Sequence, residues 1–153
     1  MRRGKLLKFL VLYYVVIGAY LICDYTFKGF RINTSESLPF YFFTSSKIKH
    51  IQRDMYVTIR HPLSKSKLAK QIVGIPGDMI RIEDGVFHVG DKVYGQILTH
   101  SRSGSPMTPI NEGFIPEGYF FVYATHPQSF DSRYAEFGLV QLDQLVEELC
   151  PLL

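Results

Sequence analysis

Short runs of β-forming residues, each closed by a turn, constrain the fold of this 153-residue chain more than any other feature. The runs are four to six residues long and rich in β-branched or aromatic side chains. They occupy residues 55–60, 71–75, 79–82, 86–89 and 118–123. Glycine, proline or aspartate closes them, and residues 79–91 fit a hairpin with tight connections. The pattern predicts an all-β fold of small antiparallel sheets.

Two other segments are less regular. Residues 99–112 are rich in Ser, Gly and Pro, which predicts a loop that projects from the sheet as a mobile flap. Residues 138–149 alternate weakly and fit either a final strand or one helical turn. The sequence contains no internal repeat, which favours a single β-rich domain.

An uncharged apolar stretch, residues 9–23, precedes this domain. With the residues just before it, and with Lys8 extending toward the lipid headgroups, it approaches the ~20 residues needed to cross a bilayer. Basic residues before the stretch and Asp24 after it favour a cytoplasmic N-terminus. We therefore predict a basic tip and transmembrane helix over residues 1–26, and an extracytoplasmic domain over residues 27–153. A cleaved secretory signal is the alternative, but no small-residue cleavage site follows the stretch.

The charge distribution argues against nucleic acid as a partner. The formal net charge is +3, but four of the 17 basic residues precede the apolar stretch. The remaining 13 basic residues are balanced by 13 of the 14 acidic residues, since only Asp24 lies before Tyr25. A phosphate-binding surface needs a basic stripe on the folded domain. The N-terminal excess is instead typical of a membrane topology signal.

Neither a metal nor a cofactor is expected. Cys23 and Cys150 lack metal-ligand spacing and a redox partner nearby, so two unpaired cysteines are favoured over a long-range disulfide. The five histidines are scattered and form no zinc-binding motif.

Ser37 is the first candidate for chemistry. A serine hydroxyl becomes a nucleophile only when a base takes its proton and donors stabilise the resulting oxyanion. Pro39 stiffens the chain just after Ser37, and Ser35 places a second hydroxyl two residues earlier. Taken alone, however, serines beside proline are more often turn residues.

Lys70 could supply the base. Lysine accepts a proton only when neutral, and burial among apolar groups lowers its pKa. Ile72, Val73 and Ile75 follow it in the sequence and would create such surroundings. The alternative is an ordinary lysine that protects an exposed strand edge.

The third segment contains Ser129, Asp131 and Arg133. In an extended stretch these three side chains would lie on one face, because side chains alternate with period two. Asp131 could then pair with Arg133, while Ser129 could hydrogen-bond the lysine amine. The alternative is a surface ion pair worth only ~0.5 kcal/mol.

These segments together, in this order, resemble the type I signal peptidase family of membrane-anchored Ser/Lys enzymes. Ser35-x-Ser37-Leu38-Pro39 is similar to its nucleophile box, residues 70–78 (KQIVGIPGD) to its lysine box, and residues 129–133 with Gly138 to its last box. The short form without a large inserted domain resembles the conjugation-associated, TraF-type branch. One departure is that residues 123–126 (YATH) replace the Gly-Asp-Asn stretch of general signal peptidases.

The resemblance implies coiled antiparallel sheets of the signal-peptidase type and a division of roles. Ser37 would be the nucleophile, Lys70 the general base, and Ser35 with the Ser37 backbone N–H the oxyanion hole. Ser129 would orient the lysine. Asp131 and Arg133 would hold the framework of the site, and Asp131 has a further implied role in joining the ends of a product.

The implied function is a serine endopeptidase in the bacterial cytoplasmic membrane, with its catalytic domain in the periplasm. It would cut a membrane-delivered precursor, a prepilin or another component of a conjugation or type IV secretion apparatus, after a small residue. The acyl-enzyme would end in hydrolysis or in a cyclic product. Two alternatives stay open: a general signal peptidase of the secretory pathway, and a non-catalytic pilus-assembly subunit.

Overall fold

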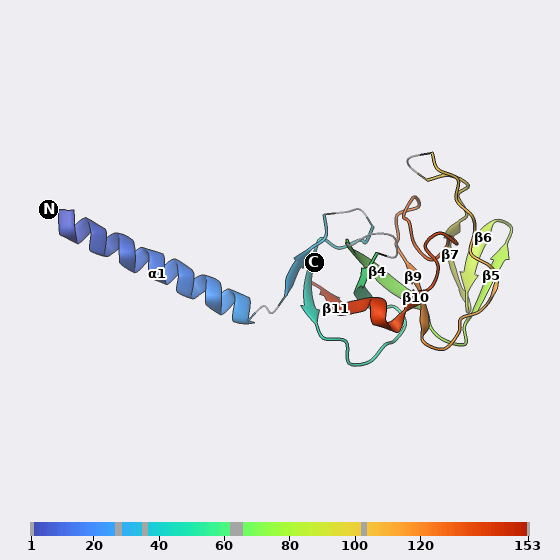
Figure 1. The fold of residues 1–153 in the computed structure, drawn as a ribbon, viewed down its shortest axis with the longest axis horizontal. Coiled ribbons are helices and arrows are strands. Elements are labelled where there is room, and N and C mark those ends of the chain that lie inside the picture. Colours follow the sequence, from blue (N-terminus) through green and yellow to red (C-terminus); the bar gives the residue numbers. More distant parts are fainter. Residues whose placement is uncertain (1, 27–28, 35–36, 62–65, 102–103, 153) are drawn as a thin grey trace.

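A computed structural model of the chain describes residues 2–26, 29–34, 37–61, 66–101 and 104–152. It begins with a single α-helix, α1 (Arg2–Thr26), which lies apart from the sheets (Figure 1). Nowhere in these residues does a helix combine the length and the apolar character required to cross a membrane. The predicted transmembrane helix is therefore not supported, although a helix does form over the predicted segment.

Seven strands form the larger sheet, and every pair of neighbours in it is antiparallel. Its strands, in spatial order, are β1 (Phe30–Ile32), β2 (Phe42–Ser46), β11 (Leu145–Pro151), β3 (Tyr56–Arg60), β4 (Lys67–Gly74), β9 (Tyr119–Tyr123) and β10 (Val140–Gln141). This order brings the C-terminal strand between two early strands, so segments from both ends of the domain meet in the centre of the sheet.

Four strands form the smaller sheet: β7 (Lys92–Gln96), β6 (Val86–Val89), β5 (Met79–Glu83) and β8 (Gly113–Phe114), in that spatial order. The predicted hairpin joins β5 to β6, where Glu83 pairs with Val86. Its two connecting residues, Asp84 and Gly85, both have positive φ angles, as a tight hairpin turn requires. The all-β prediction is thus confirmed, with sheets dominating the fold.

The two less regular segments are partly ordered by hydrogen bonds. Residues 138–149 contain both predicted alternatives, a short 3₁₀ helix (Leu142–Gln144) followed by β11. In the loop over residues 99–112, Ile110 N–H donates to the Arg133 carbonyl at 2.9 Å, and the Thr108 carbonyl accepts from Ala135 N–H at 2.8 Å. The base of this loop is therefore anchored, while Figure 1 shows the described residues nearer its middle extending away from the sheets. Residues 102 and 103 lie outside the described residues.

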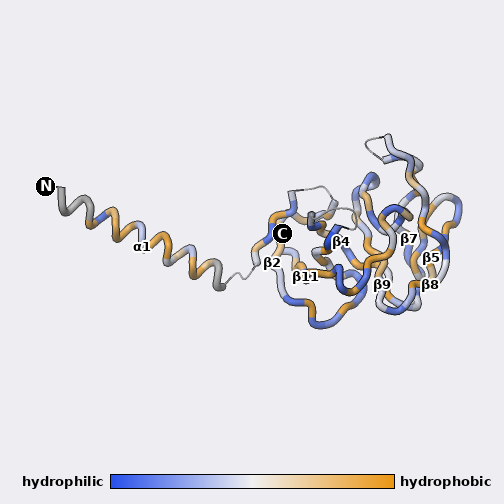
Figure 2. Tube along the Cα trace, in the orientation of Figure 1, coloured by the Kyte–Doolittle hydropathy of each residue, from blue (hydrophilic) through white to orange (hydrophobic). Residues whose placement is uncertain are grey.

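The core lies in separate clusters because β4 buries both of its faces. Ile72 packs in one cluster with Val57 and Ile59 of β3, whereas Val73 packs in a second with Phe121 and strands of the smaller sheet. Figure 2 shows the resulting mixture of hydrophobic and hydrophilic residues along the strands. The part of β4 that follows Lys70 is thus packed on both of its faces.

The end of β4 turns the chain from the larger sheet into the smaller one. The Asp78 carboxylate accepts a hydrogen bond from the Ile75 backbone N–H at 2.9 Å and pairs with Arg53. Gly77 has a φ of 88°, which a side chain would strain. Residues 75–78 of the lysine motif therefore fix the direction of the chain.

Replacing Gly74 by Ala tests this packing. A Cβ there would lie 2.5 Å from Ile115 Cδ1, 2.7 Å from Val89 Cγ1 and 2.8 Å from Phe121 Cβ. We expect a loss of roughly 1–3 kcal/mol in the free energy of unfolding, because a packed core resists an added methyl group. Denaturant titration followed by tyrosine fluorescence measures it, since the chain has no tryptophan.

Gly18→Ala is the matched control, since nothing lies within 4 Å of its added Cβ. It should leave the unfolding of the sheets unchanged. Equal stability of Gly74→Ala and wild type would contradict the packing described for β4.

Candidate active site

Lys70 lies on β4 opposite Val57 of β3, with its side chain on a buried face of the sheet. The residue is only 3% exposed, and its Nζ lies 5.9 Å from the centre of the Phe137 ring. The amine donates a hydrogen bond to Ser129 Oγ at 2.9 Å. The structure therefore brings Ser129 and the lysine amine together.

Burial lowers the pKa of the Lys70 amine from 10.5 to about 8. The main cause is the loss of water around the ammonium form, and the nearby Arg133 acts in the same direction. The Asp131 carboxylate acts in the opposite direction and limits the shift. An appreciable fraction of the amine is therefore neutral near physiological pH, as a base requires.

Asp131 and Arg133 form a fully buried ion pair beside Ser129. Arg133 Nε and Nη2 donate to the two Asp131 carboxylate oxygens at 2.8 and 3.0 Å, and the side chains are 1% and 0% exposed. The Ala124 backbone N–H donates to the same carboxylate at 3.1 Å, and Arg133 Nη2 also donates to the Ser129 carbonyl at 3.2 Å. The pair thus ties the Ser129 segment to the residue that follows β9.

The sequence predicted the grouping of these residues but not its geometry. Residues 131–133 form a bend and a turn rather than part of a strand, so alternation along a strand does not explain their grouping. Ser132 stabilises the turn instead, because its Oγ accepts from the Val122 N–H at 3.1 Å and its N–H donates to the Val122 carbonyl at 3.0 Å. The alternative of a surface ion pair is also wrong, since Asp131 and Arg133 are buried.

The backbone of Ser37 is held by Thr125, which follows Ala124 in the sequence. The Ser37 carbonyl accepts hydrogen bonds from the Thr125 backbone N–H at 3.0 Å and from Thr125 Oγ1 at 3.2 Å. Leu38 is buried against Phe43 and Leu149. The sequence did not single out Thr125, although it lies in the YATH segment that departs from general signal peptidases. Ser35, the predicted oxyanion donor, lies outside the described residues.

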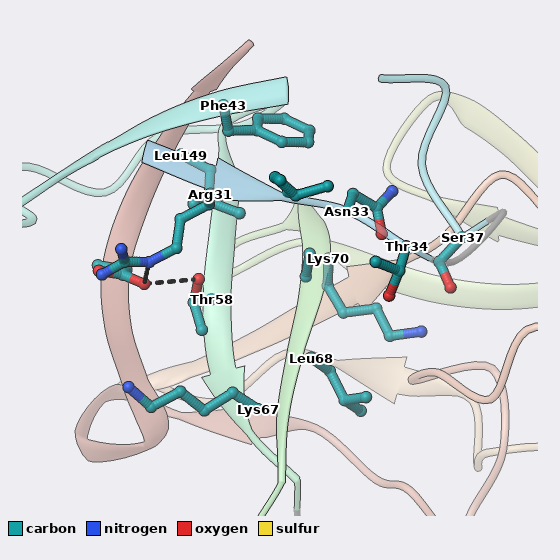
Figure 3. Close-up of a pocket in the computed structure, with 13 residues that line it drawn as sticks. Arg31, Asn33, Thr34, Ser37, Phe43, Thr58, Lys67, Leu68, Lys70 and Leu149 are labelled. Atoms are coloured by element: carbon teal, nitrogen blue, oxygen red, sulfur yellow. Dashed lines mark hydrogen bonds and ion pairs between the residues drawn. The ribbon is translucent and has the colours of Figure 1, made fainter. Parts of the chain in front are cut away.

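Ser37 and Lys70 line the same cleft, which has a volume of about 390 Å³. In Figure 3 the two side chains approach one another from opposite sides. Residues 31–34 and residues 67–70 of β4 line the same cleft. The fold therefore brings residues 37 and 70 to one cleft, and their roles stay a prediction.

The cleft is bounded by strand edges. Successive side chains of a strand point to opposite faces of the sheet. Four consecutive residues can therefore line one cleft only where the unpaired edge of their strand faces that cleft. β9 pairs with β4 from residue 71 onward, which leaves residues 67–70 with β3 on one side and the cleft on the other. β1 is itself an edge strand. An extended peptide could therefore lie between these two edges.

The site offers no arrangement for a metal ion. Among the described residues, no group of three or more His, Cys, Asp or Glu side chains is placed to hold one. Cys23 and Cys150 are both free thiols.

A family model matches nearly the whole chain. Residues 3–150 match the family described as "Signal peptidase, peptidase S26". The conjugal transfer protein TraF of Agrobacterium fabrum (strain C58) is 29% identical over 68 residues, which is 44% of this chain and 39% of that protein. The chain thus matches well under half the length of this relative. A crystal structure of a signal peptidase I from Enterococcus faecalis V583 is 22% identical, covers 68% of this chain and all of that chain, and gives a TM-score of 0.47.

The lowered pKa of Lys70 predicts a pH dependence of stability. The folded pKa of about 8 lies below the unfolded value of 10.5, so the unfolded chain binds more protons between these values. Stability should therefore rise with pH, by roughly 2 kcal/mol between pH 7 and pH 9.5. Lys70→Met, which keeps a long side chain but cannot be protonated, should lack this rise.

Denaturant titrations of both proteins across this pH range measure the difference. Lys49→Met, on an exposed loop, is the control and should follow the wild type. Parallel pH profiles for wild type and Lys70→Met would show that the amine is not buried as described.

Proposed function

Because the chain belongs to the signal peptidase family, peptidase S26, we propose that it is a serine endopeptidase with Ser37 as nucleophile and Lys70 as general base. The observation that carries this proposal is the buried Lys70 amine, with a pKa of about 8, in the cleft that Ser37 also lines. A lysine on a solvated strand edge would be charged at neutral pH and unable to accept a proton.

The proposed reaction begins when the neutral Lys70 amine takes the proton of Ser37 Oγ as that oxygen attacks the scissile carbonyl. The tetrahedral intermediate collapses when the Lys70 ammonium gives its proton to the leaving amine, which leaves an acyl group on Ser37. Ser129 holds the lysine amine in place through its hydrogen bond. The oxyanion would be stabilised by the Ser37 backbone N–H and Ser35, a role inferred from the family resemblance.

The substrate we propose is an extended segment of a precursor protein. The open edges beside residues 31–34 and 67–70 can each donate and accept main-chain hydrogen bonds, which is how extended peptides add to sheets. A small residue before the scissile bond is inferred from the resemblance alone. Thr125 would keep the Ser37 backbone in register with the peptide, because it fixes the Ser37 carbonyl with two donors.

The relationship to a conjugal transfer protein suggests the biological setting. We propose a prepilin or another conjugative-transfer component as the precursor, cut and released by water or by an amine of the substrate itself. An amine would leave a cyclic product, one water lighter than the trimmed linear chain. A place at the bacterial cytoplasmic membrane follows from the family and the basic N-terminus. The topology, with a periplasmic catalytic domain, rests on the sequence alone.

Ser37→Ala and Lys70→Ala should each abolish processing of the precursor in cells, because either change removes a proposed reacting group. Immunoblotting of precursor and product measures the outcome. Ser46→Ala, at the exposed end of β2, and Lys49→Ala are matched controls that should process normally. Labelling by a serine-directed acylating probe, lost in Ser37→Ala, should accompany processing. Normal processing by either variant would end the proposal, and an unreactive Ser37 in folded protein would favour a non-catalytic subunit.

The rate of peptide cleavage should rise with pH and reach half its maximum near pH 8, where half of the Lys70 amine is neutral. Between pH 6 and pH 8 the increase should be about 50-fold, since a single base of this pKa is ~1% neutral at the lower value. Steady-state kcat/KM over this range is the measurement. A flat profile, or a single rise near the ordinary histidine pKa, would exclude Lys70 as the base.

A further inference from the structure

The end of the cleft away from Ser37 carries charged side chains. Arg31, Lys67 and Glu147 line it, together with Thr58. Figure 3 shows Arg31 and Lys67 on the far side of Thr58 from Ser37. The catalytic end and this charged end are therefore two distinct regions of one groove.

The Glu147 carboxylate accepts hydrogen bonds from other side chains of the protein. Arg31 Nε and Nη2 each donate to a different oxygen of its carboxylate at 2.9 Å, and Thr58 Oγ1 donates at 3.2 Å. The Arg31 hydrogen bonds lower the pKa of the Glu147 carboxyl, so it stays ionised at neutral pH. Arg31 and Glu147 together thus form a neutral pair.

Lys67 and Arg60 add uncompensated positive charge beside this pair. They lie directly opposite one another across β3 and β4, and like charges at such positions are unfavourable. Arg60 Nη1 donates to the backbone carbonyl of Asp143 at 3.0 Å. Within the described part of the chain, no carboxylate forms an ion pair with either cation. Among the described residues that line the cleft, Glu147 is thus the one carboxylate, while Arg31 and Lys67 line this end and Arg60 lies opposite Lys67 on β3.

We propose that this end of the cleft binds a carboxylate of the substrate, with Lys67 as its main contact. The proposal rests on the proposed peptidase function, because it places the substrate in the same groove. A carboxylate would relieve the repulsion between Lys67 and Arg60. Lys67 lies three residues from Lys70, or ~10 Å along an extended strand. The carboxylate should therefore lie about three residues from the scissile bond.

The test measures binding rather than turnover, with the full chain carrying Ser37→Ala. The probes are fluorescent alanine-threonine peptides with both ends blocked, in which one Glu is moved stepwise along the peptide and compared with Gln at the same place. At one position, Glu should bind about two- to fivefold more tightly than Gln, the range expected for partly exposed ion pairs. The ratio should fall at high salt.

Charge reversal supplies the sharper measurement. With Lys67→Glu added, the preference at that position should reverse, so that a Lys peptide binds more tightly than the Glu peptide. Lys49→Glu makes the same charge change outside the cleft and should leave the preference intact. A separate series of shortened peptides with a free C-terminus distinguishes a chain-terminal carboxylate from a side-chain one, since only a terminal carboxylate would be lost on blocking.

The outcomes separate this proposal from the peptidase itself. The carboxylate subsite would be overturned by equal binding of Glu and Gln peptides at every position, by no measurable binding of any peptide, or by no effect of Lys67→Glu. Each of these results would count against the subsite even if the wild type cleaves peptides. A reversible Glu preference in a chain that neither cleaves nor acylates would support the subsite and reject the peptidase.

Discussion

The burial of the Lys70 amine is the interaction on which the site depends. Removing a lysine from water disfavours its ammonium form, and the hydrogen bond to Ser129 Oγ partly replaces the lost hydration. The result is a pKa of about 8. This value lies between the pKa of a solvated lysine and that of a lysine buried without a nearby carboxylate. The Asp131 carboxylate sets this balance, because without it burial and the Arg133 charge would both lower the pKa. The fold must therefore hold three charged groups close together in a dry interior.

The Asp131–Arg133 pair shows how the fold does so. Burying two ions is costly unless every donor and acceptor is used, and this pair is supported by backbone groups at Ala124 and Ser129. The same contacts fix the loop that contains Ser129 and the segment that contains Thr125, which in turn holds Ser37. One buried ion pair thus connects the parts of the chain that approach the cleft from different directions.

Much of the fold and part of the site could be predicted from the sequence. The β-runs were visible because apolar and β-branched residues cluster between turn residues. The lysine motif was recognised by its resemblance to the family's lysine box, and the structure shows that its Gly77 and Asp78 form a defined turn. The geometry of residues 129–134 was not predictable, since their spacing fits an extended strand as well as the turn that Ser132 stabilises. Thr125 was missed because its partner, Ser37, lies 88 residues away, beyond the reach of any local pattern. The N-terminal segment was predicted as a helix from its apolar residues, but a membrane span was not supported.

The separation of the two ends of the cleft has an electrostatic reason. A substrate carboxylate beside Lys70 would stabilise its ammonium form and raise the pKa of this proposed base. At ~10 Å the attraction is about 0.4 kcal/mol in water and about 1.7 kcal/mol at an effective dielectric constant of 20. These energies correspond to roughly 0.3 and 1.2 pKa units. Lys67 and Arg60 lie on the solvated side of β3 and β4, so the smaller value applies more closely. The proposed charged subsite can therefore select a substrate at this distance while leaving most of the Lys70 pKa shift intact. A subsite nearer to Lys70 would change the pKa of the proposed base.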